Sequence, residues 1–310
     1  MRSRFLLPDG EVSDAVRAFL PDEDFRLFSE ALTDGDLSAV EFYVPPYPGA
    51  RPYPGAQPVI EMLSRLPGLK VVQLLTAGVD WILPSIEPGV LLCRAIGVHE
   101  ASVAEQVMAS ILAVTKAIPA FVAFQAEAVW AHRRVGGLLG MRAIVLGYGS
   151  IGRATGDLLR AFGVEVTGIS RSGRDGALPL AEISGLLTGS DILVITLPLT
   201  DETRGIVDAE MLSLLPDGAL VVNVSRGPVV DSAALEDELV SGRLRAALDV
   251  TDPEPLPSDS PLWHRSNVLI TPHVGGDTDL FPRLASRMVV AQVTRYIRGL
   301  PLEHQVTGTY

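Results

Sequence analysis

Between residues 141 and 276 the chain repeats short runs of Val, Ile and Leu with helical stretches between them, and this repetition restricts the possible folds. Three of the runs are ALVVNV at 219–224, LRAALDV at 244–250 and VLIT at 268–271. Apolar β-type runs separated by helices predict a parallel sheet that is covered on both faces. Ligands of such sheets bind beyond the carboxyl ends of the strands. We therefore expect functional residues in the loops that follow these runs.

The remaining parts of the chain predict a second α/β domain. The expected strands lie at 4–7, 39–44, 69–75 and 90–93, and the expected helices at 11–19 and 57–66. After Asp279 the pattern predicts one long helix that ends near Gly299 and returns to the first domain. The fold class is thus α/β with two doubly wound domains. The first comprises 1–95 plus 281–310, and the second, 96–280, is inserted into it.

Residues 45–58, PPYPGARPYPGAQP, contain too much Pro and Gly for regular structure and predict a loop. Its tyrosines, Tyr47 and Tyr53, either cover part of the core or form a wall of a ligand pocket.

Net charge, cysteine content and the lengths of the apolar runs disfavour several classes of function. The net charge of −12 disfavours nucleic acid and anionic membrane surfaces as partners. Cys93 is the only cysteine, so an intrachain disulfide is excluded, and the histidines are not spaced as metal ligands, so we expect no metal. The N-terminus does not resemble a secretory signal, and no apolar run has membrane-spanning length. We expect a cytoplasmic protein.

A glycine-rich motif after the run at 142–146 predicts a dinucleotide site. The motif GYGSIG comprises Gly147, Tyr148, Gly149, Ser150, Ile151 and Gly152. Its glycines permit a tight turn and a close approach of the backbone to a pyrophosphate, which the N-terminus of the expected helix 150–162 attracts. An ordinary βαβ crossover is the alternative, but a preceding strand and a second strand at 164–169 are the context that a dinucleotide site requires.

The end of that second strand bears on the choice of cofactor. Sites for NAD usually place Asp or Glu there, whereas this chain has Ser170, Arg171 and Ser172, with Arg174 close by. No acidic residue in this segment repels a 2′-phosphate, and an arginine with two hydroxyls is able to bind one. We therefore expect NADPH/NADP to be preferred, with NADH as the weaker cofactor. A solvent-exposed turn with little cofactor discrimination is the alternative.

Three side chains of different chemistry follow the apolar runs at 219–224, 244–250 and 268–271: a cation, a carboxylate and an imidazole. Arg226 lies in Ser-Arg-Gly-Pro, Glu254 in Pro-Glu-Pro and His273 in Thr-Pro-His. A guanidinium binds a carboxylate in bidentate fashion, an imidazole transfers protons, and a carboxylate beside it favours its charged form. Taken singly, each residue is compatible with a surface or structural role. Together they predict a site that reduces a 2-keto acid.

Several segments together resemble the D-2-hydroxyacid dehydrogenase family. They are LLTAGVD (74–80), SVAEQVMASIL (102–112), LGYGSIG (146–152), LPLTDETRGIV (197–207), ALVVNVSRGPVVDSAAL (219–235), LRAALDVTDPEPLP (244–257) and NVLITPHVGG (267–276). The resemblance implies a Rossmann dinucleotide-binding domain inserted into a flavodoxin-like substrate domain. It also implies that Arg226 binds the substrate carboxylate, His273 is the general acid and Glu254 holds the imidazole.

The resemblance implies further contacts. The backbone of Ala77, Gly78 and Val79 is expected at the substrate carboxylate, and Asp249 at the nicotinamide carboxamide. Pro198, Val224 and Ser225 are expected along the cofactor. Asp231 is expected to cap the helix that begins near Ser232.

The leading interpretation is an NADPH-dependent reductase of 2-keto acids to D-2-hydroxy acids, with glyoxylate or hydroxypyruvate as the first candidates. The alternatives are a dinucleotide-sensing binding protein like the corepressors of this fold, and a phosphite-type dehydrogenase. Formate dehydrogenase activity is disfavoured, because those relatives carry glutamine where this chain has Glu254. Helix 101–117 resembles the family's dimerisation helix and predicts a homodimer.

Overall fold

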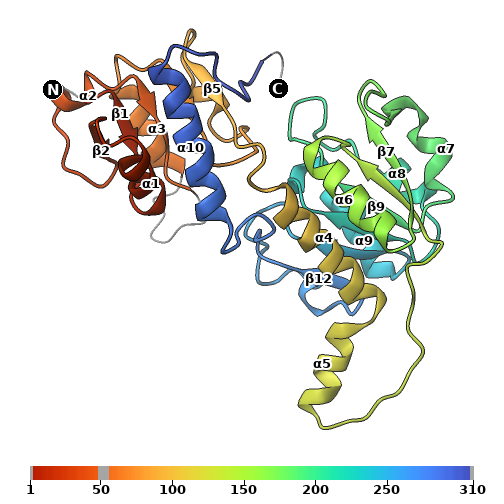
Figure 1. The fold of residues 1–310 in the computed structure, drawn as a ribbon. Coiled ribbons are helices and arrows are strands. Elements are labelled where there is room, and N and C mark those ends of the chain that lie inside the picture. Colours follow the sequence, from red (N-terminus) through yellow and green to blue (C-terminus); the bar gives the residue numbers. More distant parts are fainter. Residues whose placement is uncertain (1–2, 48–55, 308–310) are drawn as a thin grey trace. The chain divides into compact units, whose positions relative to one another are not determined.

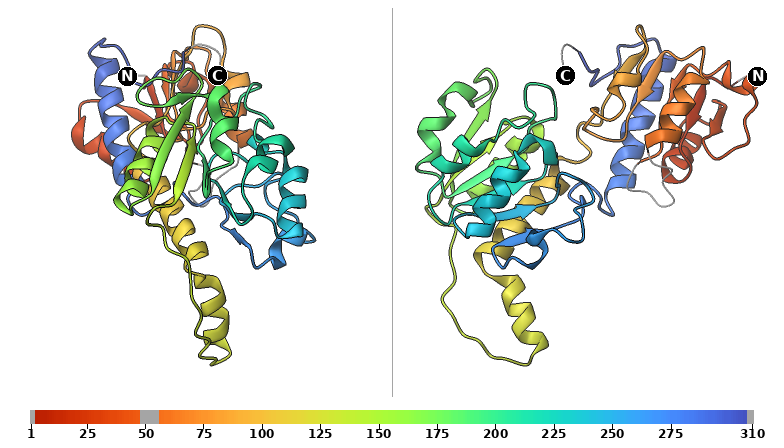
Figure 2. Two further views of the ribbon diagram at one scale, coloured as in Figure 1. Left: turned by 90° about the vertical axis from the view of Figure 1, so that its right-hand side faces the viewer. Right: turned by 180° about the vertical axis from the view of Figure 1, so that it is seen from behind.

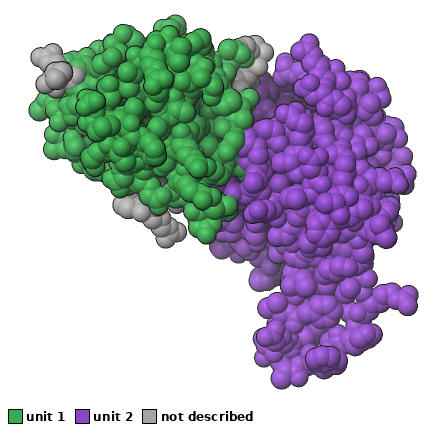
Figure 3. All heavy atoms as spheres, in the orientation of Figure 1, with its two compact units in different colours: residues 1–99, 277–310 green, residues 100–276 purple. Residues whose placement is uncertain are grey.

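The computed structural model describes residues 3–47 and 56–307. The chain forms two compact units (Figure 3). Unit 1 comprises Met1–His99 and Asp277–Tyr310, and unit 2 comprises Glu100–Gly276. Within the described residues each unit contains one sheet whose paired strands are all parallel, with one isolated antiparallel bridge between Cys93 and Gln305, and this confirms the expected fold class of two α/β domains.

The sheet of unit 1 has the order β2-β1-β3-β4-β5, which is the flavodoxin-like order. Its strands are β1 (Phe5–Leu7), β2 (Phe25–Leu27), β3 (Phe42–Tyr43), β4 (Val71–Gln73) and β5 (Leu91–Cys93), and its helices are α1 (Glu11–Phe19), α2 (Asp34–Leu37), α3 (Ala56–Ser64) and α10 (Phe281–Ile297). Helix α10 lies beside α1 (Figure 1). It buries Phe281, Ala285, Val289 and Val293, whose four-residue spacing places them on one helix face toward the sheet.

The sheet of unit 2 has the order β12-β11-β10-β9-β6-β7-β8. Its strands are β6 (Arg142–Leu146), β7 (Glu165–Ser170), β8 (Leu178–Pro179), β9 (Ile192–Ile195), β10 (Leu220–Asn223), β11 (Arg245–Leu248) and β12 (Val268–Ile270), and its helices are α4 (Glu100–Thr115), α5 (Ile118–Ala126), α6 (Ser150–Ala161), α7 (Ile183–Leu187), α8 (Ala209–Leu214) and α9 (Ser232–Ser241). The direction of strand order reverses between β6 and β9. In open parallel sheets that point is where a ligand crevice forms.

Both faces of this sheet are buried. Ile144 and Leu146 of β6 belong to one apolar cluster, whereas Ala143 and Val145 belong to the cluster on the opposite face. Successive side chains of a strand point to opposite faces, so a strand between two layers of helices needs apolar residues at every position. The continuous apolar runs of the sequence are the result of this burial.

Helix α5 is an element that the sequence did not predict. The chain leaves α4 through Ala117, whose φ of 55° is left-handed, and Pro119 stands in the first turn of α5. Figures 1 and 2 show α5 projecting away from the sheet of its unit. Within the described residues no single helix has the length and apolarity to cross a membrane, although α4 and α5, bent by 63° at their junction, pass that test as a pair.

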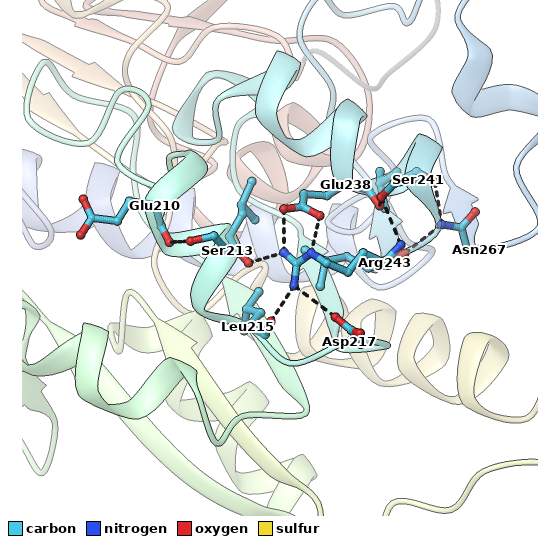
Figure 4. A network of polar contacts seen from close by, with 11 residues as sticks. Glu210, Ser213, Leu215, Asp217, Glu238, Ser241, Arg243 and Asn267 are labelled. Carbon is cyan, nitrogen blue, oxygen red and sulfur yellow. Dashed lines mark hydrogen bonds and ion pairs between the residues drawn. The ribbon is translucent and has the colours of Figure 1, made fainter.

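Arg243 joins two helices of unit 2 (Figure 4). Its guanidinium binds both carboxylate oxygens of Glu238 on α9, with Nε–Oε2 and Nη2–Oε1 distances of 2.5 and 2.7 Å. It also donates to the carbonyls of Leu212 and Leu215 at the end of α8, at 2.7 Å each. One side chain therefore adds hydrogen bonds to carbonyls at the C-terminal end of α8, where few helical donors remain.

The Arg243→Ala variant is expected to lose about 2–3 kcal/mol of unfolding free energy, because charge-assisted bonds and buried carbonyl partners are lost together. Urea unfolding followed by circular dichroism measures the loss. Arg298→Ala, which removes an exposed arginine, is the matched control. Equal midpoints for the two variants would contradict this role.

Candidate functional site

The three predicted site residues of unit 2 follow adjacent strands. Arg226 lies three residues after β10, Glu254 six residues after β11 and His273 three residues after β12. Because β10, β11 and β12 are neighbours and parallel, their carboxyl ends lie at one edge of the sheet. The Nδ1 atom of His273 is 2.6 Å from Oε1 of Glu254. The structure thus brings together two groups that lie 19 residues apart.

The charge state of Glu254 reflects both neighbours. Partial burial raises the pKa of this carboxyl, but the hydrogen bond and charge of His273 outweigh that effect, and the charge of Arg226 lowers the pKa further. The net result is a pKa below the usual range, so Glu254 is ionised at neutral pH. With Nδ1 of His273 bonded to Glu254, the Nε2 atom is the ring nitrogen left to exchange a proton with a substrate.

Asn223, which is not among the predicted site residues, holds the backbone that carries Arg226. Its amide nitrogen donates to the carbonyl of Arg226 at 3.0 Å, and its Oδ1 accepts from the backbone N–H and the hydroxyl of Ser225 at 3.0 and 2.9 Å. Asn223 is buried at the end of β10. Its position after an apolar run was the available signal, since a buried amide requires partners.

Gly227 permits the loops of Arg226 and Glu254 to touch. A Cβ atom at this position would lie 2.0 Å from the carbonyl oxygen of Thr251 and 2.7 Å from the nitrogen of Asp252. Only glycine allows this approach of two backbones. The glycine after Arg226 therefore couples the segment that follows β10 to the segment that follows β11.

The loop of His273 is held by Asp249. His273 has a left-handed φ of 53°, which is uncommon for a residue with a Cβ atom. The buried carboxylate of Asp249 accepts from the N–H groups of Val274 and Gly275 at 3.1 and 2.9 Å and from the Thr271 hydroxyl at 2.5 Å. Gln106 of α4 in turn donates to that hydroxyl. These bonds make Asp249 a clamp on the histidine loop, and its expected contact with the nicotinamide stays a prediction.

The Asp249→Asn variant is expected to lower kcat for keto acid reduction roughly 10- to 100-fold, because an amide cannot accept all three bonds and the imidazole loses its fixed position. The dissociation constant of NADPH, measured by its fluorescence, is expected to change little. Asp259→Asn removes an exposed carboxylate from the same unit and is the control. A large loss of NADPH affinity with normal kcat would instead support the nicotinamide contact expected from the resemblance.

The glycine-rich loop connects β6 to α6. Gly147 has a φ of 103°, and a Cβ atom there would lie 2.7 Å from the backbone of Thr196 and Leu197, which follow β9. The loop is therefore packed against the end of β9, at the point where the strand order reverses. Gly149 caps α6 without a side-chain acceptor, so the first N–H groups of the helix at Ser150, Ile151 and Gly152 face an anion-binding position.

In the glycine-rich motif the backbone is available to a ligand, whereas the side chain of Tyr148 is packed into the core of the unit. The ring of Tyr148 is buried against Gly168 of β7, and its hydroxyl accepts a hydrogen bond from Arg160 at 2.8 Å. Tyr148 can therefore offer a dinucleotide only its backbone. Further along the edge, the Ser225 hydroxyl is bonded to Asn223, and the carbonyl of Pro198 accepts from Thr203 at 2.6 Å. Val224 lies beside them, with its N–H directed to the carbonyl of Ile195.

The end of β7 carries the predicted 2′-phosphate site. Ser170 accepts a bond from the N–H of Gly173, which shapes the turn, and Arg171 and Ser172 are exposed. Arg171 is paired with Glu202 of the loop after β9, at 2.6 Å. The segment itself contains no acidic residue, but the fold supplies one from elsewhere in the chain. Glu202 is therefore a carboxylate near this site that the local segment does not reveal.

Three predicted residues belong to unit 1. The segment Ala77–Val79 follows β4, and the hydroxyl of Thr76 donates to the carbonyl of Gly78 at 2.8 Å. The Val79 side chain is fully buried in the core of unit 1, so only its backbone is available for binding. The predicted loop at 45–58 includes Tyr47, whose ring packs at a tilt against Phe281, whereas Tyr53 lies outside the described residues. Over residues 3–47 and 56–307 no cluster of three or more His, Cys, Asp or Glu side chains is arranged to hold a metal ion.

Comparisons with known proteins find relatives over most of the chain. The sequence profile "D-isomer specific 2-hydroxyacid dehydrogenase, NAD binding domain" matches residues 108–275. D-3-phosphoglycerate dehydrogenase of Methanocaldococcus jannaschii is 32% identical over 257 residues, which are 79% of this chain and 49% of that protein. The chain thus spans about half the length of that relative.

Two solved structures cover almost the whole chain. A D-isomer specific 2-hydroxyacid dehydrogenase from Xanthobacter autotrophicus Py2, in complex with NADPH and MES, is 34% identical with a TM-score of 0.81 and covers 97% of this chain and 98% of its own. An NADPH-dependent glyoxylate/hydroxypyruvate reductase from Sinorhizobium meliloti, in complex with NADP and sulfate, is 30% identical with a TM-score of 0.83 and covers 98% of each chain.

Proposed function

Because the chain belongs to the D-isomer-specific 2-hydroxyacid dehydrogenase family, a family of NAD(P)-dependent oxidoreductases, we propose that it reduces a small 2-keto acid to the D-2-hydroxy acid with NADPH as the preferred hydride donor. The observation that carries this proposal is the 2.6 Å contact between His273 and Glu254 at the strand edge that also carries Arg226.

Each residue has a distinct chemical task in this proposal. The guanidinium of Arg226 binds the substrate carboxylate and orients the keto group. The bound dinucleotide supplies the hydride. His273 donates the proton from Nε2 to the keto oxygen, and Glu254 stabilises the protonated imidazole through Nδ1. In the oxidation direction His273 accepts the same proton.

Glyoxylate and hydroxypyruvate are the proposed substrates. The similarity to the glyoxylate/hydroxypyruvate reductase of Sinorhizobium meliloti supports them, whereas the similarity to the D-3-phosphoglycerate dehydrogenase of Methanocaldococcus jannaschii points to phosphoglycerate. A panel of 2-keto acids with the purified protein, following NADPH and NADH oxidation, tests the proposal. Turnover of at least one small 2-keto acid is expected. No turnover, with cofactor still bound, would favour the dinucleotide-sensing protein.

Arg171 and the two serines support the preference for NADPH. The same panel gives kcat/KM for each cofactor, and a higher value with NADH would contradict the preference. The absence of a catalytic metal and a location in the cytoplasm stay predictions.

A homodimer is part of the proposal. Helix α4 is packed within its unit against α6 and β10–β12, whereas α5 has no buried residue. Trp130 is 96% exposed and borders an apolar groove of about 620 Å³ with Phe121 and Phe124. Exposed apolar surface of this kind supports a protein contact that extends from α4 over α5. Light scattering is expected to give the dimer mass, and Trp130→Asp the monomer mass. A monomeric wild type at micromolar concentration would refute the dimer.

A further inference from the structure

Glu202 and Arg171 form an ion pair across the mouth of the dinucleotide site in unit 2. The Nη2 atom of Arg171 is 2.6 Å from Oε2 of Glu202. Arg171 follows β7 and Glu202 follows β9, and these two strands flank β6 on opposite sides. The glycine-rich loop begins at the end of β6. The pair therefore bridges the two strands on either side of the loop that binds the pyrophosphate.

The loop that carries Glu202 is well braced. The hydroxyl of Thr203 donates to the carbonyl of Pro198 at 2.6 Å and accepts from the N–H of Thr200 at 2.8 Å. The N–H of Thr203 is directed to the hydroxyl of Thr200 at 3.2 Å. Beyond it, Gly205 donates to the carbonyl of Pro228 at 2.8 Å. Glu202 thus stands on a fixed turn, so its carboxylate is held near the end of β7.

The pair distinguishes between a 2′-phosphate and a 2′-hydroxyl. Both side chains are 63% exposed, so their mutual attraction is weak and a phosphate is able to displace Glu202 from Arg171. After displacement the carboxylate still lies close to the phosphate, and two like charges at short range repel each other. A neutral 2′-hydroxyl meets no such repulsion and donates a hydrogen bond to the carboxylate.

We propose that Glu202 sets the degree to which the protein prefers NADPH over NADH. Its carboxylate competes with the 2′-phosphate of NADPH for Arg171, and it accepts a hydrogen bond from the 2′-hydroxyl of NADH. This inference rests on the proposed function of unit 2 as the site of both cofactors. It assigns to a residue 31 positions beyond Arg171 the role that an acidic residue at the end of the second strand has in most NAD sites.

The Glu202→Gln variant tests the proposal through binding alone. The dissociation constants of NADPH and NADH are measured by nicotinamide fluorescence at low ionic strength, without substrate. The ratio of NADH to NADPH dissociation constants is expected to rise roughly three- to tenfold, because the repulsion is removed and one acceptor is weakened. Asp201→Asn, which neutralises the adjacent exposed carboxylate, is the matched control and is expected to leave the ratio near its wild-type value.

A double-variant cycle with Arg171→Gln isolates the pair. In that background Glu202→Gln is expected to raise NADPH affinity less than in the wild type, because the competition for Arg171 is gone and only the direct repulsion of the phosphate remains. An unchanged ratio in the single variant, or weaker NADPH binding, would overturn the proposal, since the latter would mean that Glu202 positions Arg171 for the phosphate. A protein that binds both cofactors yet reduces no keto acid would refute the proposed reaction. The ratio of the two dissociation constants would still test the role of Glu202. Failure to bind either cofactor would overturn both.

Discussion

The His273→Ala variant is expected to lower kcat for keto acid reduction by about three orders of magnitude, because the transition state loses its proton donor. The KM of the keto acid is expected to change much less, since the carboxylate contact through Arg226 is retained. Steady-state NADPH oxidation at saturating keto acid measures both constants. His264→Ala removes an exposed histidine of the same unit and is expected to retain wild-type kinetics. Near-normal turnover in the His273 variant would refute its role as the acid.

Replacement of Glu254 provides a pH-dependent test of the role of His273 as proton donor. The pKa of Glu254 lies below its usual range, so its negative charge is present throughout the neutral range and is lost only as the pH falls through that lowered value. This charge favours the protonated imidazole. In the wild type the reduction rate is therefore expected to fall in acid only as the pH passes through the lowered pKa of Glu254. Glu254→Gln has no carboxylate to protonate and is expected to lack that acid limb, with a lower rate at neutral pH. An acid limb that persists unchanged in Glu254→Gln would show that Glu254 does not act through His273.

The Arg226→Ala variant is expected to raise the KM of the keto acid about 100-fold and to lower kcat as well, because the substrate carboxylate loses its bidentate partner and its orientation. The dissociation constant of NADPH is expected to stay within about twofold, since Arg226 does not belong to the glycine-rich loop. Substrate titrations with NADPH fluorescence binding separate the two effects.

Arg226→Lys is the matched variant. It retains the positive charge but loses the planar fork, so its KM is expected to lie between the values of the wild type and the alanine variant. Equal KM values for wild type and Arg226→Ala would show that the carboxylate is bound elsewhere.

Local patterns made most elements of unit 2 predictable. The apolar runs at 142–146, 219–224, 244–250 and 268–271 contain β6, β10, β11 and β12, because strands that lie between two layers of helices carry apolar side chains on both faces. Asp231 caps α9 as predicted, accepting from two backbone N–H groups at 3.1 Å. Helix α5 was not predicted, because its apolar residues continue the pattern of α4. The left-handed backbone of Ala117 separates the two helices, and the apolar pattern does not reveal it.

The sequence alone determined which sheet edge carries the predicted site residues. Parallel strands place their carboxyl ends at one edge, so Arg226, Glu254, His273 and the glycine-rich loop had to follow the strands of that edge. This argument needs only the order of runs and loops along the chain.

The tertiary structure decided which groups are partners. Asp249 binds the histidine loop, Asn223 holds the backbone of Arg226, and Glu202 reaches Arg171. The contacts of Asp249 and Glu202 depend on strand order and loop geometry over tens of residues, and no local pattern encodes them. The carboxylate at the cofactor edge is the clearest case, because a segment without acidic residues acquires one only when β7 and β9 are placed on either side of β6.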